Sequence, residues 1–343
     1  MQKKQKKKEV LSATSELLMS MEQKSIKTDL RIKKVLACKP ILAVIFAEVV
    51  EECEGMSYEE IESCIEGDVV VEEDFIMPTE VITGNTQEDY KPGEGLIRYD
   101  IKTYLLLPAS KNEKKSVAVK LIIDVEAQKN DNPGYDIVTR GIFYCCRMIS
   151  AQLDSEFYNN ANDKKQYANL KKVYSIWICT EVSEKKKNTI EKYSIKKEML
   201  YGKSVSDDDY YDLMTVIKVN IGKVHSGEEI DNALLATMNV ITDVHFSADE
   251  KIKKLKALNV KMTNEVEQEV SDMTSYLANI IEESEAKGKT IGLAEGKTIG
   301  LAEGEAKILQ LISKLYEQNR ANEVLKATTD ASYREKLYKE FDI

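Results

Sequence analysis

Three polar residues occupy alternate positions at the end of an otherwise apolar segment, VAVKLIIDVEAQK: Asp124, Glu126 and Gln128. Residues two apart in a β-strand lie on the same face, so these side chains would share one face, and the other face would carry Val117, Val119, Leu121, Ile123 and Val125. Asp100 belongs to the preceding apolar segment, RYDIKTYLLLP. If the two segments pair as a hairpin across the charged turn SKNEKKS, Asp100 lies near Glu126. The spacing predicts a carboxylate cluster on one sheet.

Such a cluster suits metal-assisted hydrolysis of a phosphodiester bond. Mg²⁺ prefers oxygen ligands and is usually held by one or two carboxylates together with substrate phosphates and water. The metal polarises the phosphoryl oxygen and lowers the pKa of its bound water. Gln128, two positions after Glu126, would lie beside the attacking water. By itself, an aspartate followed later by Glu-x-Gln is a weakly specific pattern.

The segment resembles the PD-(D/E)XK nuclease superfamily, in particular the Rpn-type recombination-promoting nucleases and the PD-(D/E)XK nuclease family transposases. The similarity continues through PGYDIVTRGIFYCCRMISAQ, KKVYSIWICTEV and YDLMTVIKVNIG, and it covers roughly residues 30 to 275. The resemblance implies a catalytic site of Asp100, Glu126, Gln128 and Arg140, with Mg²⁺ or Mn²⁺ held by Asp100 and Glu126. Gln128 is neutral where most superfamily members have lysine, a feature shared with the Rpn-type proteins.

The same resemblance implies an α/β fold. A restriction-endonuclease-like core would have a mixed central sheet flanked by helices, in the order αβββαβ, followed by a C-terminal helical extension. The first helix of the superfamily often contributes a glutamate to the metal site, and Glu48 is the matching candidate. The competing interpretation places Glu48 at an exposed helix edge.

Local patterns predict the elements that would position these residues. Residues 41–53 read as a buried helix beginning near Pro40, and SYEEIESCI as a second helix with Ser57 and Glu60 as a capping box. Residues 68–95 are acidic and irregular, with room for one short strand. Residues 173–180 and 190–200 read as further strands, and the first of these carries Trp177 as a core residue.

A helix following Gly134 would carry Arg140, Tyr144 and Arg147 along one face. An arginine directed toward the strand carboxylates can hold the scissile phosphate, because its guanidinium is always charged and binds phosphate bidentately. A surface salt bridge is the alternative. The resemblance favours Arg140 over Arg147.

Cysteine and histidine usage argues against several other enzyme classes. None of the six cysteines has a partner at zinc-ligand spacing, which indicates reduced thiols in a cytoplasmic protein. The only two histidines, His225 and His245, lie far downstream of the predicted cluster and read as structural. No apolar run is long enough to cross a bilayer, so we expect no membrane partner.

Charge is unevenly distributed along a chain whose formal net charge is −10. Residues 48–76 contain twelve acidic side chains and no lysine or arginine, whereas residues 161–200 contain ten lysines against five acids. The second stretch predicts a DNA-binding surface that includes Lys164, Lys165, Lys171 and Lys172. A solvated lysine face is the competing interpretation, and the basic arm after Met1 is another candidate for phosphate contact.

The chain divides into five predicted segments: a basic arm and helix (1–29), a nuclease-like domain (30–230), a helical segment (231–285), a glycine-repeat spacer (286–306) and a terminal helical module (307–343). The spacer contains KTIGLAEG twice, with glycine at every fourth position. This spacing favours a flexible, partly helical spacer, with a close-packed helical dimer as the alternative. Within the terminal module, an apolar face would join two chains into a homo-oligomer: Leu309, Ile312, Leu315 and Tyr316.

The predicted function is therefore a metal-dependent DNA endonuclease, a hydrolase of the recombination-promoting or transposase type. The alternative is a nuclease fold that has lost hydrolysis and binds DNA or a protein partner. An RNase-H-like transposase ranks last, because its further carboxylate would have to come from Asp207 to Asp209, in a polar loop.

Overall fold

The computed structural model describes residues 27–67, 69, 88–91, 95–108, 119–155, 166–202, 211–222 and 230–343. The described chain forms two compact units, residues 1–278 and 279–343, which are treated separately below. Several predicted features lie outside the described residues: the basic arm, Lys164, Lys165, Asp207 to Asp209 and His225.

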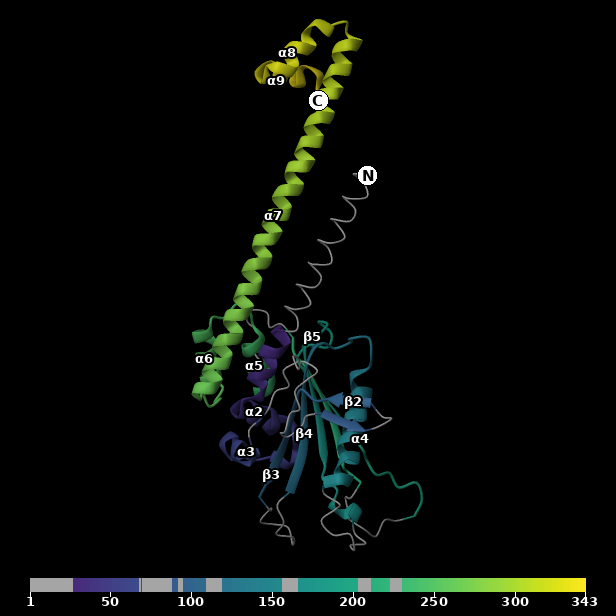
Figure 1. Ribbon diagram of the computed structural model, residues 1–343, viewed down its shortest axis with the longest axis vertical. Helices are drawn as coiled ribbons and strands as arrows, with labels where there is room; N and C mark the ends of the chain where they lie inside the picture. Colours follow the sequence, from purple (N-terminus) through teal and green to yellow (C-terminus); the bar gives the residue numbers. More distant parts are fainter. Residues whose placement is uncertain are drawn as a thin grey trace. The chain divides into compact units, whose positions relative to one another are not determined.

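A five-stranded mixed sheet forms the centre of the first unit (Figure 1). Its spatial order is β3-β4-β5-β7-β6, with β4, β5 and β7 parallel and the two edge strands antiparallel to their neighbours. The strands are β3 (Ile101–Leu107), β4 (Val119–Asn130), β5 (Val173–Glu181), β6 (Thr189–Ser194) and β7 (Met214–Asn220). The predicted α/β class with a mixed sheet and flanking helices is confirmed.

The segment before β3 differs from the prediction. Two short strands, β1 (Glu88–Lys91) and β2 (Gly95–Arg98), pair antiparallel with each other in a separate two-stranded sheet. Within the described residues, two central-sheet strands therefore precede helix α4 (Ile137–Ser155), where the order αβββαβ requires three. A Pro-Gly dipeptide favours a turn, and β1 and β2, which precede and follow Pro92 and Gly93 in the sequence, pair with each other.

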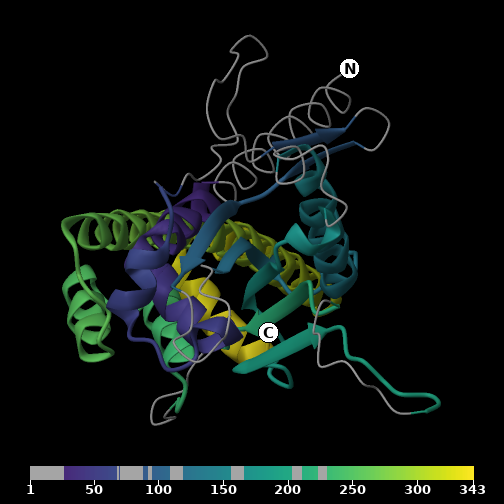
Figure 2. The same ribbon diagram turned by 90° about the horizontal axis from the view of Figure 1, so that it is seen from below.

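The sheet is covered on both faces (Figure 2). Leu121, Ile123 and Val125 of β4 point to one face and pack against α2 (Lys39–Val49), α5 (Ala233–Thr242) and the first turns of α7 (Asn264–Glu317). Ile122 of β4 and Trp177 of β5 point to the other face and pack against α4. Trp177 is fully buried, so its predicted role in the core is confirmed.

The core continues past the predicted boundary at residue 230. Leu234 and Met238 of α5, Leu255 of α6 (Ala248–Ala257) and Val270 of α7 are buried in the same cluster as the sheet. Their apolar side chains complete the face that β4, β5 and β7 present. Residues 231–277 are therefore part of the first unit and not a separate helical segment.

The N-terminal helices follow their predicted signals, with a change in length. Pro40 lies in the first turn of α2, which ends at Val49 and is followed by the short 3₁₀ helix η1 (Glu51–Cys53), so the predicted helix over 41–53 is interrupted. Helix α3 (Tyr58–Cys64) has the predicted capping box: Glu60 N donates to Ser57 Oγ at 3.3 Å, and Ser57 N donates to Glu60 Oε2 at 2.8 Å.

In the second unit, the glycine repeat is helical throughout, where the prediction was a partly helical spacer. Helix α7 runs without a break through both copies of KTIGLAEG to Glu317, and α8 (Val324–Thr329) and α9 (Ala331–Phe341) follow (Figure 1). The alanine, leucine, lysine and glutamate residues of the repeat are strong helix formers and offset the cost of its glycines. Leu315 is buried inside this unit, whereas Leu309 and Tyr316 remain 66% and 61% exposed, so the predicted apolar face is divided. Among the described helices, none is long and apolar enough to cross a membrane.

A glycine sets the distance between α4 and the sheet. A Cβ atom at Gly141 would lie 2.6 Å from Val216 Cγ1 and 3.0 Å from Trp177 Nε1, both from buried side chains. We expect Gly141→Ala to push α4 away from the sheet and lower the free energy of unfolding by about 1–3 kcal/mol, measured by urea denaturation. A matched control is Gly296→Ala, which meets nothing within 4 Å and should stabilise its helix. An unchanged denaturation midpoint for Gly141→Ala would show that the contact is not tight.

Candidate active site

Asp100 lies in the short connection between β2 and β3, directly before the first residue of β3. Ile101, the first residue of β3, pairs with Val125, which brings Asp100 opposite Glu126. Asp100 N donates to Glu126 Oε1 at 3.0 Å, and Ala127 N donates to Asp100 Oδ2 at 3.0 Å. The predicted hairpin, with Asp100 beside Glu126, is confirmed.

Asp124 adds a third carboxylate to this pair. It shares a face of β4 with Glu126, and both are buried. Asp124 Oδ2 accepts a hydrogen bond from Ser175 Oγ at 3.0 Å, and Ser175 Oγ accepts one from Trp177 Nε1 at 2.9 Å. Asp124 Oδ1 has no donor among the described residues, and the Glu126 carboxyl lies beside it. The period-two pattern included Asp124 in the predicted cluster, whereas the resemblance gave it no catalytic role.

Burial and mutual repulsion change the protonation of these carboxyls. Burial raises the pKa of Asp124 to about 7. Burial, followed by the charges of Asp124 and Asp100, raises the pKa of Glu126 well above its ordinary value. Two carboxyl groups in contact cannot both ionise without a nearby cation, so at neutral pH the pair retains a proton.

Lys33 is the cation of the cluster, and sequence reasoning missed it. It lies on the helix of residues 27–37, where its Nζ is 2.9 Å from Asp100 Oδ1 and 2.7 Å from Asp29 Oδ2. The Lys33 and Asp100 side chains are only 11% and 17% exposed. The one local signal is the four-residue spacing of Asp29 and Lys33, which predicts an ion pair on a helix but does not indicate Asp100 as a partner.

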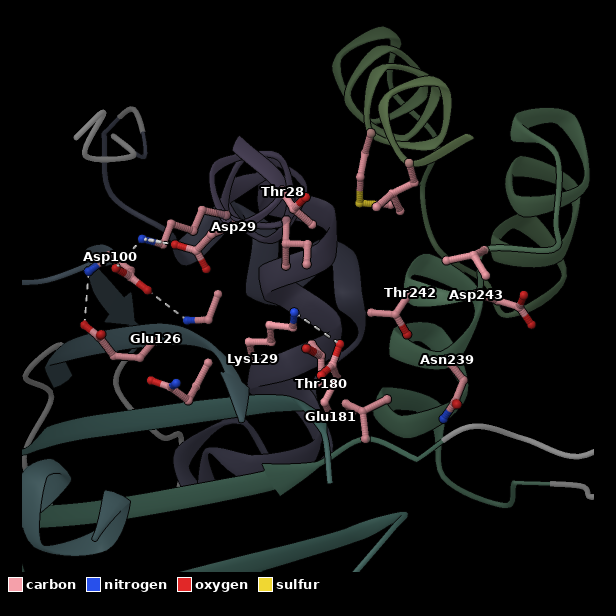
Figure 3. A pocket seen from close by; sticks show the side chains of 18 of the residues that line it. Thr28, Asp29, Asp100, Glu126, Lys129, Thr180, Glu181, Asn239, Thr242 and Asp243 are labelled. Atoms are coloured by element: carbon pink, nitrogen blue, oxygen red, sulfur yellow. Dashed lines mark hydrogen bonds and ion pairs between the residues drawn. The ribbon is translucent and has the colours of Figure 1, made fainter. Parts of the chain in front are cut away.

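These residues line a pocket of about 730 Å³ (Figure 3). Asp100 and Glu126 lie on one side of it, and Asn239, Thr242 and Asp243, from α5 and the residue after it, lie on the other. Asp29, Lys33, Gln128 and Arg140 also contribute to the wall. The pocket thus brings Asp100 and Glu126 together with Lys33, Arg140 and the neutral amide of Gln128.

Arg140 is held at this pocket by aromatic residues. Its Nε and Nη2 donate to Tyr144 Oη, and its Nη1 donates to Tyr135 Oη. The guanidinium carbon lies 5.0, 5.1 and 5.3 Å from the ring centres of Tyr135, Tyr144 and Trp177, respectively. Tyr135 Oη in turn donates to Gln128 Oε1 at 3.4 Å. Arg140 and Gln128 are therefore linked through one tyrosine.

Glu48, a predicted metal ligand, and Arg147, the alternative to Arg140, are not at the pocket. Glu48 is exposed on α2, accepts a hydrogen bond from Asn232 Nδ2 at 2.7 Å and lines a separate depression. The helix-edge interpretation therefore describes Glu48, because its position in α2 points it toward α5 and away from Asp100. Arg147 is buried and does not line the pocket, which agrees with the preference for Arg140.

The predicted lysine surface is only partly available. Lys172 Nζ lies 2.6 Å from Asp212 Oδ2, 3.1 Å from Glu52 Oε1 and 3.5 Å from Glu51 Oε2, and its side chain is 11% exposed. This ammonium joins β5 to the acidic turn after α2, and its charge is neutralised there. Lys171, next to it, is half-buried, with its backbone bonded to Gln152.

His245 also differs from expectation. The structure places it on the wall of the pocket, exposed, with its backbone N donating to Asp243 Oδ1 at 2.7 Å. The connection between α5 and α6 carries it there, a placement that spacing along the chain did not indicate.

The donor set fits a hard divalent cation. Asp100, Asp124 and Glu126 supply carboxylate oxygens, which Mg²⁺ and Mn²⁺ prefer, and Asp124 Oδ1 is a buried acceptor with no donor in the described chain. Within the described residues, no three His, Cys, Asp or Glu side chains already surround one point as ligands. Asp100 Oδ1 is instead directed at the Lys33 ammonium.

The raised pKa of Asp124 predicts a pH-dependent effect on stability. Its pKa of about 7 in the folded chain exceeds its ordinary value of 3.8, so its stabilising contribution is complete at low pH and is lost as pH rises through 7. In the absence of metal, Asp124→Asn should therefore raise the free energy of unfolding on the order of 2 kcal/mol more at about pH 8.5 than at about pH 5.5. Urea denaturation at both pH values measures this, with Glu181→Gln, an exposed carboxylate of the same pocket, as control. An equal effect at both pH values would contradict the raised pKa of the buried Asp124 carboxyl.

No family model matches the chain, and neither a curated protein nor a solved structure matches it. The resemblance to PD-(D/E)XK nucleases thus stands on the motif residues quoted above. The chemistry of the pocket has to support any assignment of function.

Proposed function

We propose that the protein is a metal-dependent phosphodiesterase that cuts DNA, built on a restriction-endonuclease-like core. The observation that carries this proposal is the meeting of Asp100 and Glu126 in a pocket that also contains Arg140, with the buried carboxyl of Asp124 beside Glu126. Carboxylates that lie close together in a buried site repel one another and are stabilised by a cation. A neighbouring arginine can bind an anionic substrate. The resemblance of the Asp100, Glu126, Gln128 and Arg140 pattern points to the same reaction class.

Asp100 and Glu126 would hold the metal ion, with Asp124 as a further oxygen donor. A bound Mg²⁺ or Mn²⁺ polarises the phosphoryl group and lowers the pKa of the attacking water. The backbone N–H groups of Asp100 and Ala127 fix one oxygen of each ligand, so both carboxylates are oriented before any cation arrives. Orientation of this kind reduces the reorganisation that binding and reaction require.

Arg140 would bind the scissile phosphate. Three of its five N–H groups donate to the tyrosine hydroxyls in the described chain, which leaves two for phosphate oxygens. The rings of Tyr135, Tyr144 and Trp177 restrict its motion. Gln128, tied to Tyr135, would orient the attacking water through its amide but, being neutral, adds no positive charge.

Cleavage should depend on metal and on the two ligands. We expect the purified full chain to nick or cut plasmid DNA with Mg²⁺ or Mn²⁺ and to stop with EDTA, measured by gel electrophoresis. Asp100→Asn and Glu126→Gln should lower the rate by about 100-fold or more, because each removes a ligand charge. The matched control is Glu48→Gln, whose carboxylate lies outside the pocket and should leave the rate unchanged. Cleavage that persists in EDTA would exclude the metal mechanism.

Arg140 should affect turnover more than binding. Loss of a group that stabilises the transition state commonly lowers kcat by about 100- to 1,000-fold. Arg140→Ala should show such a loss in single-turnover cleavage, while the Kd for DNA, measured by fluorescence anisotropy in Ca²⁺, changes by less than about tenfold. Equal losses in both measurements would make Arg140 a binding residue only.

The second candidate is a nuclease fold that binds DNA without cutting it. Gln128 favours this function, because it is a neutral residue at the position two after Glu126, where most superfamily members have lysine. Anisotropy that detects DNA binding, together with no cleavage in Mg²⁺, Mn²⁺ or Co²⁺, would support it.

A further inference from the structure

The carboxylate cluster contains more negative charge than Lys33, the cation that contacts Asp100, can neutralise. Asp124 and Glu126 are buried, the side chain of Asp100 beside them is 17% exposed, and Lys33 contributes a single ammonium. Buried charges are stable only when paired, so the ammonium has a strong electrostatic reason to remain where it is. Any metal that enters must do so against this existing ion pair.

Backbone hydrogen bonds engage one oxygen of Asp100 and one oxygen of Glu126. Asp100 Oδ2 accepts from Ala127 N, and Glu126 Oε1 accepts from Asp100 N. The other oxygen of Asp100, Oδ1, is the atom that Lys33 contacts at 2.9 Å. Oδ1 is the Asp100 oxygen that makes no backbone hydrogen bond, so it is the better ligand for an entering cation, and Lys33 contacts it.

We propose that the Lys33 ammonium is the built-in counter-ion of this site and that a divalent cation binds by displacing it from Asp100. The inference rests on the proposed metal site formed by the same carboxylates. It explains why no three ligands are gathered around one point in the described chain, since Asp100 is turned toward Lys33. A divalent ion brings one more positive charge than the ammonium and matches the three carboxylates better.

Asp29 makes this exchange feasible. It lies one helical turn before Lys33 and contacts the same ammonium at 2.7 Å, with a side chain that is 36% exposed. After leaving Asp100, Lys33 keeps this partner and stays on the pocket wall. The displacement therefore breaks one ion pair and does not leave a buried lysine unpaired.

The experiment measures Mn²⁺ binding to the full chain without nucleic acid, by electron paramagnetic resonance and by calorimetry. Lys33→Met removes the ammonium and preserves most of the apolar stem, so Mn²⁺ should bind about tenfold tighter or more than to the parent protein. Lys33→Arg retains the charge and should show no gain. The matched control is Lys129→Met, which removes a positive charge from the same pocket, where Lys129 pairs with Glu181 at 3.6 Å.

Thermal unfolding keeps the proposal testable if Lys33→Met is unstable without metal. Saturating Mn²⁺ should then raise its Tm by more than it raises the Tm of the parent. Unchanged affinity and an unchanged Tm shift in Lys33→Met would overturn the inference, as would an equal gain in Lys129→Met. Tighter Mn²⁺ binding in Lys33→Met without DNA cleavage by the parent would contradict the proposed hydrolysis and still support this displacement.

Discussion

The antiparallel register of β3 and β4 is the constraint on which the candidate site depends. The pairing of Ile101 with Val125 brings Asp100 beside Glu126, and the reciprocal backbone hydrogen bonds hold both carboxylates there. A shift of one residue would turn Asp124 and Glu126 to the face covered by α2 and α5, among apolar side chains. The apolar side chains of β4 resist such a shift, so burial of the core enforces the geometry of the site.

Placing acidic groups close together raises the free energy of the folded state. Side chains from separate parts of the chain offset this repulsion. The N-terminal helix supplies Lys33, β5 supplies Ser175, and α4 supplies Arg140. Gly141 permits α4 to approach Trp177 and Val216, and this approach places the guanidinium of Arg140 against the aromatic rings. The fold thus stabilises a carboxylate cluster that is short of positive charge and for that reason retains a proton at neutral pH.

The lysine-rich stretch shows why charge along the sequence is a poor guide to a binding surface. Lys172 neutralises the acidic segment after α2, and Lys192 pairs with Glu51 in the same region. The acidic segment after α2 and the lysine-rich stretch are distant in the sequence but form ion pairs with each other beside β5 and β6. Much of the positive charge expected for DNA therefore stabilises the fold in this part of the molecule.

The sequence by itself determined the elements whose signals are local. Period-two alternation indicated β4, its turn-linked partner β3 and the face shared by Asp124 and Glu126, and the capping box indicated α3. The breakers Pro92 and Gly93 did not reveal that β1 and β2 form their own sheet, and the glycine repeat concealed a continuous helix, because the neighbouring residues offset its intrinsic cost. Only the tertiary structure decided that Lys33 forms an ion pair with Asp100 and that Glu48 lies away from this site. It also decided that α5 to α7 complete the core. These contacts join residues far apart in the chain, and their stability comes from shared burial and long-range ion pairs, which leave no periodic trace in the sequence.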